Sequence, residues 1–184
     1  MKLPEQAREV FKGKIFDVYQ WDQKLYDGSS AVFEMLKRPN TVQVIVVQDG
    51  KIMITNEEQP TKGPFYSLIG GRQDEGETPL EGAVRELKEE SGLTSDDWEL
   101  FATYEPFTKI DWKIYTFIAR NCKKVSEQKL DGGEKITIKT VTFEQFCDTI
   151  FSEKFYGSEF AFDLMNMMYR EPERFEAFKK KIFQ

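Results

Sequence analysis

Three glutamates, Glu86, Glu89 and Glu90, lie close together in a stretch that is predicted to be helical. Their spacing of i, i+3 and i+4 puts the three carboxylates on the same side of a helix. Like charges at this spacing destabilise a helix, and its C-terminal end disfavours negative charge. Local stability therefore does not explain the arrangement, whereas a bound divalent cation does. Carboxylate oxygens are natural ligands of Mg²⁺, which usually also binds waters and substrate phosphate oxygens.

The helix that carries these glutamates is predicted over 78–91, because both of its ends are marked in the sequence. Thr78 is expected as the N-cap, Glu81 completes a capping box, and Pro79 suits the first helical position. Gly92 suits the left-handed position that ends a helix. The helical period predicts an apolar side that faces the core, formed by Leu80, Ala83, Val84, Leu87 and Ser91. The three glutamates are expected on the opposite side of the helix.

Residues 71–93 read GRQDEGETPLEGAVRELKEESGL and resemble the signature of the Nudix hydrolase family. That signature is G-x5-E-x7-R-E-U-x-E-E-x-G-U, in which U is a bulky aliphatic residue. The chain matches every fixed position, namely Gly71, Glu77, Arg85, Glu86, Leu87, Glu89, Glu90, Gly92 and Leu93. Chance agreement at so many positions is negligible. The resemblance implies an α/β/α sandwich in which this segment forms a loop, a helix and a second loop.

The resemblance also implies a metal site. In this family the acidic residues of the signature hold Mg²⁺, so Glu86 and Glu90 are expected as the main ligands, with Mn²⁺ as an alternative ion. Glu89 is expected to bind a further ion or to act through a water. A backbone carbonyl just before the helix often joins the ligands, and here it belongs to Gly70 or Gly71.

The chemistry implied by the resemblance is attack of a metal-activated water on a pyrophosphate phosphorus. A carboxylate outside the signature often completes such a site as the base or as an extra ligand. Glu134, in the segment LDGGEKITI, is the best match, and Asp111 and Glu105 are the alternatives. Arg85 lies one turn before Glu89 and is expected to pair with that carboxylate and orient it.

The N-terminal segment, 9–58, resembles the ADP-ribose pyrophosphatase-like branch of the family, which carries extra N-terminal strands. The branch commonly has a substrate-contacting arginine ahead of the signature, and Gln59 stands where that residue is expected. Arg72 is a candidate phosphate contact, and Phe107 is a candidate to stack on a base. The expected substrate is a nucleoside diphosphate linked to another moiety, with ADP-ribose and nucleotide sugars both open. The N-terminal strands are expected to build a homodimer, as the resemblance implies.

Two other functions stay open. One is a Nudix hydrolase that acts on nucleoside triphosphates or another nucleotide, although the N-terminal segment argues against a minimal triphosphatase. The other is a non-catalytic module that senses a nucleotide. Such modules usually lose glutamates of the signature, and this chain keeps all of them.

Composition excludes several other classes of function. The 184 residues contain no histidine, which excludes Ser-His-Asp catalysis, Cys-His catalysis and a histidine-based zinc site. The net charge is −6 and there is no basic run, which argues against a partner that is a long nucleic acid. No apolar run approaches the ~20 residues of a membrane span. We expect a cytoplasmic protein with two buried thiols, Cys122 and Cys147.

The elements that must position the acidic helix are predicted from periodicity and turn residues. Strands are expected at 9–20, 26–38, 41–48, 51–55, 66–69, 98–104, 112–120 and 135–142, a loop at 56–64, and further helices at 143–151, 158–169 and 172–183. The expected fold class is α+β, in a single domain spanning 1–184. Within it we expect an N-terminal β-hairpin extension (1–40), a Nudix core (41–145) and C-terminal helices (146–184).

Overall fold

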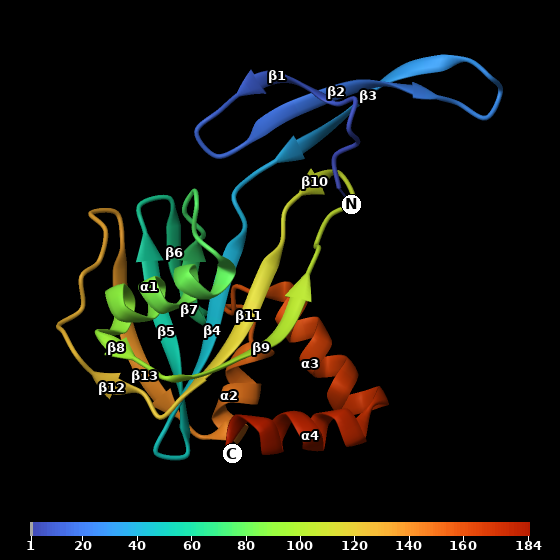
Figure 1. Cartoon of the computed structure of the whole chain (residues 1–184). Helices are drawn as coiled ribbons and strands as arrows, with labels where there is room; N and C mark the ends of the chain where they lie inside the picture. Colours follow the sequence, from blue (N-terminus) through green and yellow to red (C-terminus); the bar gives the residue numbers. More distant parts are fainter. Residues whose placement is uncertain (1) are drawn as a thin grey trace.

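The computed structural model describes residues 2–184, and a mixed central sheet organises them (Figure 1). Five strands form its main path, in the order β13 (Lys135–Val141), β5 (Lys51–Gln59), β4 (Thr41–Gln48), β11 (Ile114–Arg120) and β9 (Asp97–Tyr104). Two more strands extend it, β6 (Lys62–Ser67) beside β5 and β7 (Ile69–Arg72) beside β4. Only the β4–β11 pair of this sheet is parallel.

Helices cover both faces of this sheet. The helices are α1 (Pro79–Ser91), α2 (Phe143–Ile150), α3 (Ser158–Arg170) and α4 (Pro172–Ile182). Strand β4 is apolar on both faces: Val42 and Val44 pack in the core beside α1, and Ile45 packs in the core beside α2, α3 and α4. A strand buried on both faces reads as a continuous apolar run. The α/β/α sandwich expected from the sequence is therefore confirmed.

Arg120 ties the C-terminal helices to the sheet. This buried side chain donates from Nε to the carbonyl of Lys181 (2.8 Å), at the end of α4. Its other nitrogens pair with Asp97 (3.1 Å) and Glu99 (2.7 Å) on β9. Only the planar guanidinium presents several donors in one fixed fork. One side chain thus joins β11, β9 and α4.

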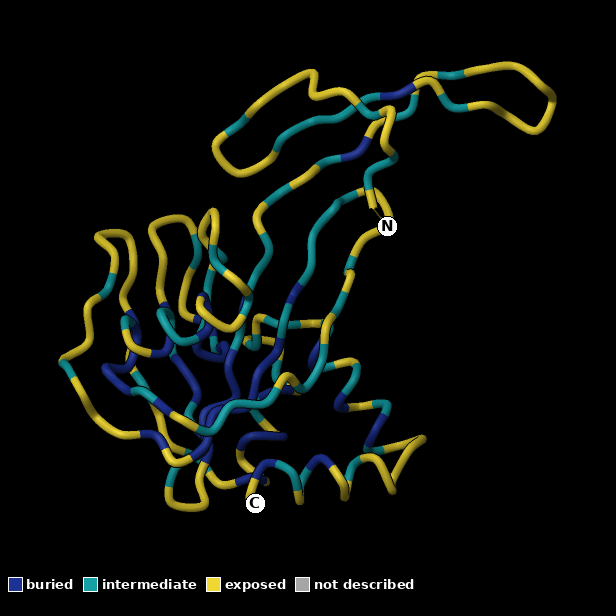
Figure 2. Tube along the Cα trace, in the orientation of Figure 1, coloured by how far each residue is buried: buried dark blue, intermediate teal, exposed yellow. Residues whose placement is uncertain are grey.

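The N-terminal strands form a separate sheet that projects from the sandwich (Figures 1 and 2). It consists of β1 (Arg8–Lys12), β2 (Asp17–Lys24), β3 (Ser30–Lys37) and β10 (Ile110–Asp111), and β3 leads directly into β4. A short pair, β8 (Leu93–Thr94) with β12 (Lys123–Lys124), follows α1. The projecting sheet exposes large apolar side chains, including Val10, Phe11, Ile15, Phe16, Tyr26 and Val32.

Two predictions about the strands were wrong. The predicted strand 9–20 is two strands, because the chain turns at Gly13, where a Cβ would overlap the carbonyl oxygen of Phe16. The predicted loop 56–64 is a hairpin, since β5 runs to Gln59 and β6 starts at Lys62. The polar composition of 56–64 is typical of a loop. In the structure, however, β5 pairs with β6 across the turn and with β13, which lies far away in the sequence. The predicted C-terminal helices agree with the structure to within a residue at each end.

Among the residues that the structure describes, no helix combines the length and apolar character needed to cross a membrane.

The role of Arg120 gives a first prediction. Arg120→Lys keeps the charge but cannot serve Asp97, Glu99 and the Lys181 carbonyl together, so partly buried acceptors lose donors. We expect the free energy of unfolding to fall by about 1–3 kcal/mol, measured by urea denaturation. Arg170→Lys, at an exposed position in the last turn of α3, is the matched control. Equal urea midpoints for the two variants would contradict the assigned role.

Candidate functional site

Helix α1 begins and ends as the sequence predicts. The Thr78 hydroxyl accepts a hydrogen bond from the backbone N–H of Glu81 (3.3 Å), and the Glu81 side chain accepts one from the backbone N–H of Thr78 (2.7 Å). Gly92 ends the helix in the left-handed conformation, with φ 68°. These caps satisfy backbone groups that a helix leaves without partners and hold α1 in register against β4 and β7.

Arg85 joins α1 to the loop that precedes it. It donates to Glu77 (2.8 Å), Glu86 (2.9 Å) and Glu89 (2.9 Å), and also to the carbonyl of Arg72 (2.9 Å). The Arg85–Glu89 pair predicted from the sequence is therefore present. Hydrogen bonding to Glu77 raises the pKa of Arg85, and the same contact lowers the pKa of Glu77. Arg85 thus stays charged and fixes the carboxylates around it.

Glu90, predicted on the side of the helix opposite the apolar side, is buried in the structure. Glu90 is only 4% exposed, and its Oε2 accepts a hydrogen bond from the backbone N–H of Gly70 (3.1 Å). Leu80, expected to face the core, is 41% exposed. The helical period gives the angles between side chains, but it does not show which side of the helix the neighbouring strands cover. Here β7 covers the side that carries Glu90.

Burial shifts the titration of two signature carboxyls. Desolvation raises the pKa of Glu90 to about 9, and the nearby charges of Glu57 and Glu86 add to the shift. Desolvation also raises the pKa of Glu86 to about 7, although Arg85 opposes this shift. Buried carboxylates that repel one another are costly without compensating positive charge. The site therefore favours a bound cation.

Two glycines allow β7 to approach the helix. A Cβ at Gly71 would lie 2.6 Å from Oε1 of Glu86, so the missing side chain leaves the space that this carboxylate occupies. Gly70 has φ 148°, and a Cβ there would overlap the carbonyl oxygen of Val42. Larger residues would push β7 away from α1 and β4. The pair therefore sets how closely Glu86 and Glu90 lie to the sheet.

Glu57, a carboxylate on β5 that is only 8% exposed, was not predicted from the sequence. Hydroxyls of Thr55 and Ser67 donate to its Oε1. The signal that would have found it is the alternation of side chains along β5, in which Glu57 follows Thr55 onto the same face. The mistaken loop at 56–64 hid that alternation.

Glu134 lies in the loop before β13, where its side chain accepts a hydrogen bond from the backbone N–H of Asp131 (3.4 Å). Partial burial raises the pKa of Glu134, as do the charges of Asp131, Glu57 and Glu89. The structure therefore brings Glu134 to the signature carboxylates.

The alternatives to Glu134 lie elsewhere. Asp111 belongs to β10, which pairs with β3 of the projecting sheet, and Glu105 pairs with Lys113 (3.6 Å). Neither is among the groups that most shift the pKa of Glu86 or Glu90.

Two arginines, Arg38 and Arg72, lie near each other, and the backbone carbonyl of Arg72 accepts a hydrogen bond from Arg85. Nε of Arg38 is buried and has no hydrogen-bond partner among the described residues. Its guanidinium lies 4.4 Å from the centre of the Trp112 ring. Desolvation lowers the pKa of Arg38, and the charge of Arg72 lowers it further, so the two cations lie near each other. The sequence analysis proposed Arg72 but missed Arg38, because a single arginine after a strand is an ordinary pattern.

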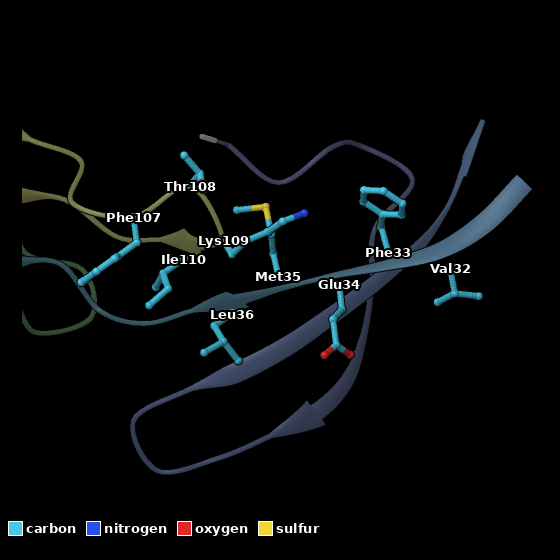
Figure 3. A pocket seen from close by; sticks show the side chains of 9 residues that line it. All are labelled: Val32, Phe33, Glu34, Met35, Leu36, Phe107, Thr108, Lys109 and Ile110. Atoms are coloured by element: carbon cyan, nitrogen blue, oxygen red, sulfur yellow. The ribbon is translucent and has the colours of Figure 1, made fainter. Parts of the chain in front are cut away.

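The other two predicted substrate contacts lie in different places. Gln59 is exposed at the end of β5, two residues beyond Glu57. Phe107 lies in the loop after β9, is 52% exposed and stacks on Trp112 with ring centres 6.2 Å apart. Figure 3 shows it at one end of a groove that Phe33, Met35 and Lys109 also line. Phe107 thus faces the projecting sheet. It contacts Trp112, and Trp112 also contacts Arg38.

The donor set fits a hard divalent cation. Among the residues that the structure describes, no group of three or more His, Cys, Asp or Glu side chains is arranged as a ready metal site. Arg85 engages two of the signature carboxylates, Glu86 and Glu89. The carboxylate oxygens and the burial of Glu90 suit Mg²⁺ or Mn²⁺.

Comparisons with known proteins agree with this geometry. The model of the NUDIX domain matches residues 37–159. The chain is 28% identical to the ADP-ribose pyrophosphatase of Bacillus subtilis, over 89% of this chain and 90% of that protein. It is 25% identical to the methanol dehydrogenase activator of Bacillus methanolicus, over 83% and 85%. A crystal structure titled ADP compounds hydrolase superposes with a TM-score of 0.70 at 18% identity, covering 91% of this chain and 95% of the other.

The buried charge of Glu90 gives a second prediction. Glu90→Gln keeps an acceptor for the Gly70 N–H but removes the charge, so in EDTA the variant should melt at a higher temperature than the wild type at pH 8. The folded pKa of about 9 lies above the unfolded value of ~4.3, so wild-type stability should fall, relative to the variant, as pH rises between these values.

The measurement is a series of thermal melts from pH 5 to pH 9 in EDTA. Glu89→Gln, at a partly exposed position, is the control and should show little gain. A Glu90→Gln protein that melts below the wild type at pH 8 would show that the buried charge has a partner we have not identified.

Proposed function

This chain belongs to the Nudix family and is a Nudix hydrolase, and we propose that it hydrolyses the pyrophosphate bond of a nucleoside diphosphate linked to another moiety, with Mg²⁺ as cofactor. The observation that carries the proposal is the burial of Glu90 beside Glu86 and against Gly70, in a site that favours a cation. ADP-ribose or a nucleotide sugar is the proposed substrate class. The similarity to an ADP-ribose pyrophosphatase along nearly the whole chain supports it.

Glu86 and Glu90 are the proposed main ligands of the cation, with the Gly70 carbonyl beside them. Glu89 binds a further ion or acts through a water, and Arg85 positions Glu86 and Glu89 through its hydrogen bonds. When bound, Mg²⁺ offsets phosphate charge and makes a water a better nucleophile. Mn²⁺ has the same preference for oxygen ligands and would substitute for it.

Glu134 is the proposed base that accepts the proton of the attacking water. Its pKa is raised from the ordinary value by partial burial and nearby carboxylates, which makes the carboxylate a stronger proton acceptor. The Asp131 backbone N–H holds one of its oxygens and limits its orientation.

Arg38 and Arg72 are proposed to bind the phosphates of the substrate. Two cations placed near each other repel, so an anion between them removes an unfavourable interaction. Guanidinium groups match phosphate with two parallel hydrogen bonds. Phe107, close by through Trp112, is the proposed surface for a base, and Gln59 a further polar contact.

We further propose that residues 1–184 form one domain and that the protein is a cytoplasmic homodimer. The apolar side chains on the projecting sheet, among them Phe11 and Val32, form a surface that a second copy would cover. Cys122 and Cys147 are buried free thiols, which suits a reducing compartment.

The metal assignment predicts the effect of charge removal on turnover. Glu86→Gln and Glu90→Gln should each lower kcat by about 100-fold or more, because the cation loses a charged ligand. The assay measures phosphate-coupled hydrolysis with Mg²⁺ across ADP-ribose, nucleotide sugars, dinucleotides and nucleoside triphosphates. Glu75→Gln, in the exposed part of the preceding loop, should keep wild-type activity. Near-normal turnover in both signature variants would refute the assignment.

The phosphate assignment predicts a change in KM. Arg38→Gln should raise KM about 10-fold or more for the preferred diphosphate, since a charge-assisted hydrogen bond contributes about 1.5–3 kcal/mol. Lys37→Gln, at the neighbouring exposed position, is the matched control. An unchanged KM in Arg38→Gln would remove this arginine from the substrate site.

The dimer proposal predicts a solution mass of twice the 21.6 kDa of one chain, measured by light scattering after size exclusion. Phe11→Asp should shift the protein towards the monomer, because it places a charge in the proposed apolar interface. A monomeric wild type would contradict the proposal.

A further inference from the structure

Glu57 lies on the face of β5 that turns towards α1. Along this strand Ile52 and Ile54 pack in the core beside α2, α3 and α4, while Met53 packs against the core beside α1. Side chains alternate along a strand, so Thr55 and Glu57 share the face of Met53. A carboxylate that is only 8% exposed is rare in proteins unless it has a partner.

The hydrogen bonds of Glu57 are all on one oxygen. The Thr55 hydroxyl donates to Oε1 (2.9 Å), and the Ser67 hydroxyl donates to the same atom. No described residue donates to Oε2. This oxygen is not one of the buried polar atoms that lack a partner, so it keeps contact with solvent. The two hydroxyls therefore hold the carboxylate in place while one oxygen stays available for a ligand.

Two routes through the structure link Glu57 to Glu90. Ser67, which holds Glu57, lies three residues before Gly70, whose N–H holds Glu90. On the other side, Gln128 donates to the carbonyl of Glu90 (2.6 Å) and to that of Ile136 (3.3 Å), and Ile136 is the strand partner of Glu57. In agreement, the charge of Glu57 contributes more than any other charge to raising the pKa of Glu90.

The lysine that responds to the charge of Glu57 does not pair with it. The Lys62 ammonium lies 3.6 Å from the centre of the Phe65 ring and 3.2 Å from that of the Tyr156 ring. It responds to the charge of Glu57, but the structure has no ion pair between them among the described residues. Two aromatic faces hold this lysine instead.

We propose that Oε2 of Glu57 is a further oxygen ligand of the divalent cation that Glu90 binds, contributed by the sheet rather than by α1. This inference rests on the proposed function, because it assigns a ligand to the same cation. Thr55 and Ser67 are then positioning residues that orient the carboxylate. Supporting groups of this kind fix the orientation of metal ligands in proteins.

The test measures Mn²⁺ binding to the full chain by isothermal titration calorimetry, in the absence of nucleotide. Glu57→Gln keeps an acceptor for both hydroxyls but replaces the available oxygen, and it should weaken Mn²⁺ binding about 10-fold or more. Glu58→Gln is the matched control, because Glu58 is the next residue, exposed, and paired with Lys135 (3.1 Å). It should bind Mn²⁺ as the wild type does.

The outcomes separate this inference from the proposed function. Wild-type affinity in Glu57→Gln, with binding lost in Glu90→Gln, overturns the inference and leaves the proposed metal site standing. Equal affinity in the wild type and Glu90→Gln, or no binding by the wild type, overturns the proposed site itself. Thermal melts in EDTA show whether Glu57→Gln is folded. If it is not, Glu57→Asp replaces it, since the shorter side chain retracts the oxygen, and wild-type affinity in that variant overturns the inference.

Discussion

A buried negative charge is the constraint on which the site depends. Glu90 lies between α1 and β7 with one backbone N–H for a partner, and burial raises its pKa to about 9. A charge in this position is costly for folding, and a helix with Glu86 and Glu89 beside it adds repulsion. Residues that destabilise the fold locally are expected at sites where they are needed for binding rather than for folding. The glycine pair at 70–71 and the hydrogen bonds of Arg85 hold these charges close together.

Charge is divided across the site in a way that suits a metal-bound pyrophosphate. Carboxylates from α1, from β5 and from the loop before β13 lie near enough to raise one another's pKa, and Arg38 and Arg72 lie near each other. A cation held by the carboxylates and phosphates held by the arginines would each offset charge that the protein leaves uncompensated. The chain as a whole is acidic, so these arginines provide local positive charge where the net charge does not.

The scaffold separates the elements that bear the site from those that support it. Strands β4, β5 and β7 with α1 carry the acidic cluster, while α2, α3 and α4 bury the opposite face of the sheet. Arg120 ties that helical layer to the sheet edge. The projecting sheet approaches the site through Arg38 and Trp112, which lie next to its strands. The proposed phosphate-binding arginine Arg38 therefore depends on how this sheet is held.

The sequence by itself determined the caps of α1, the Arg85–Glu89 pair, the α+β class and the choice of signature carboxylates. All of these depend on spacing within a few residues or on one dense motif. The burial of Glu90, the place of Glu57 on a strand and the nearness of Arg38 to Arg72 were decided only by the tertiary structure. Each depends on which strand covers a helix sector or pairs with a polar segment. The contacts that bury Glu90 and bring Arg38 to Arg72 join residues far apart in the chain, so local patterns carry no information about them.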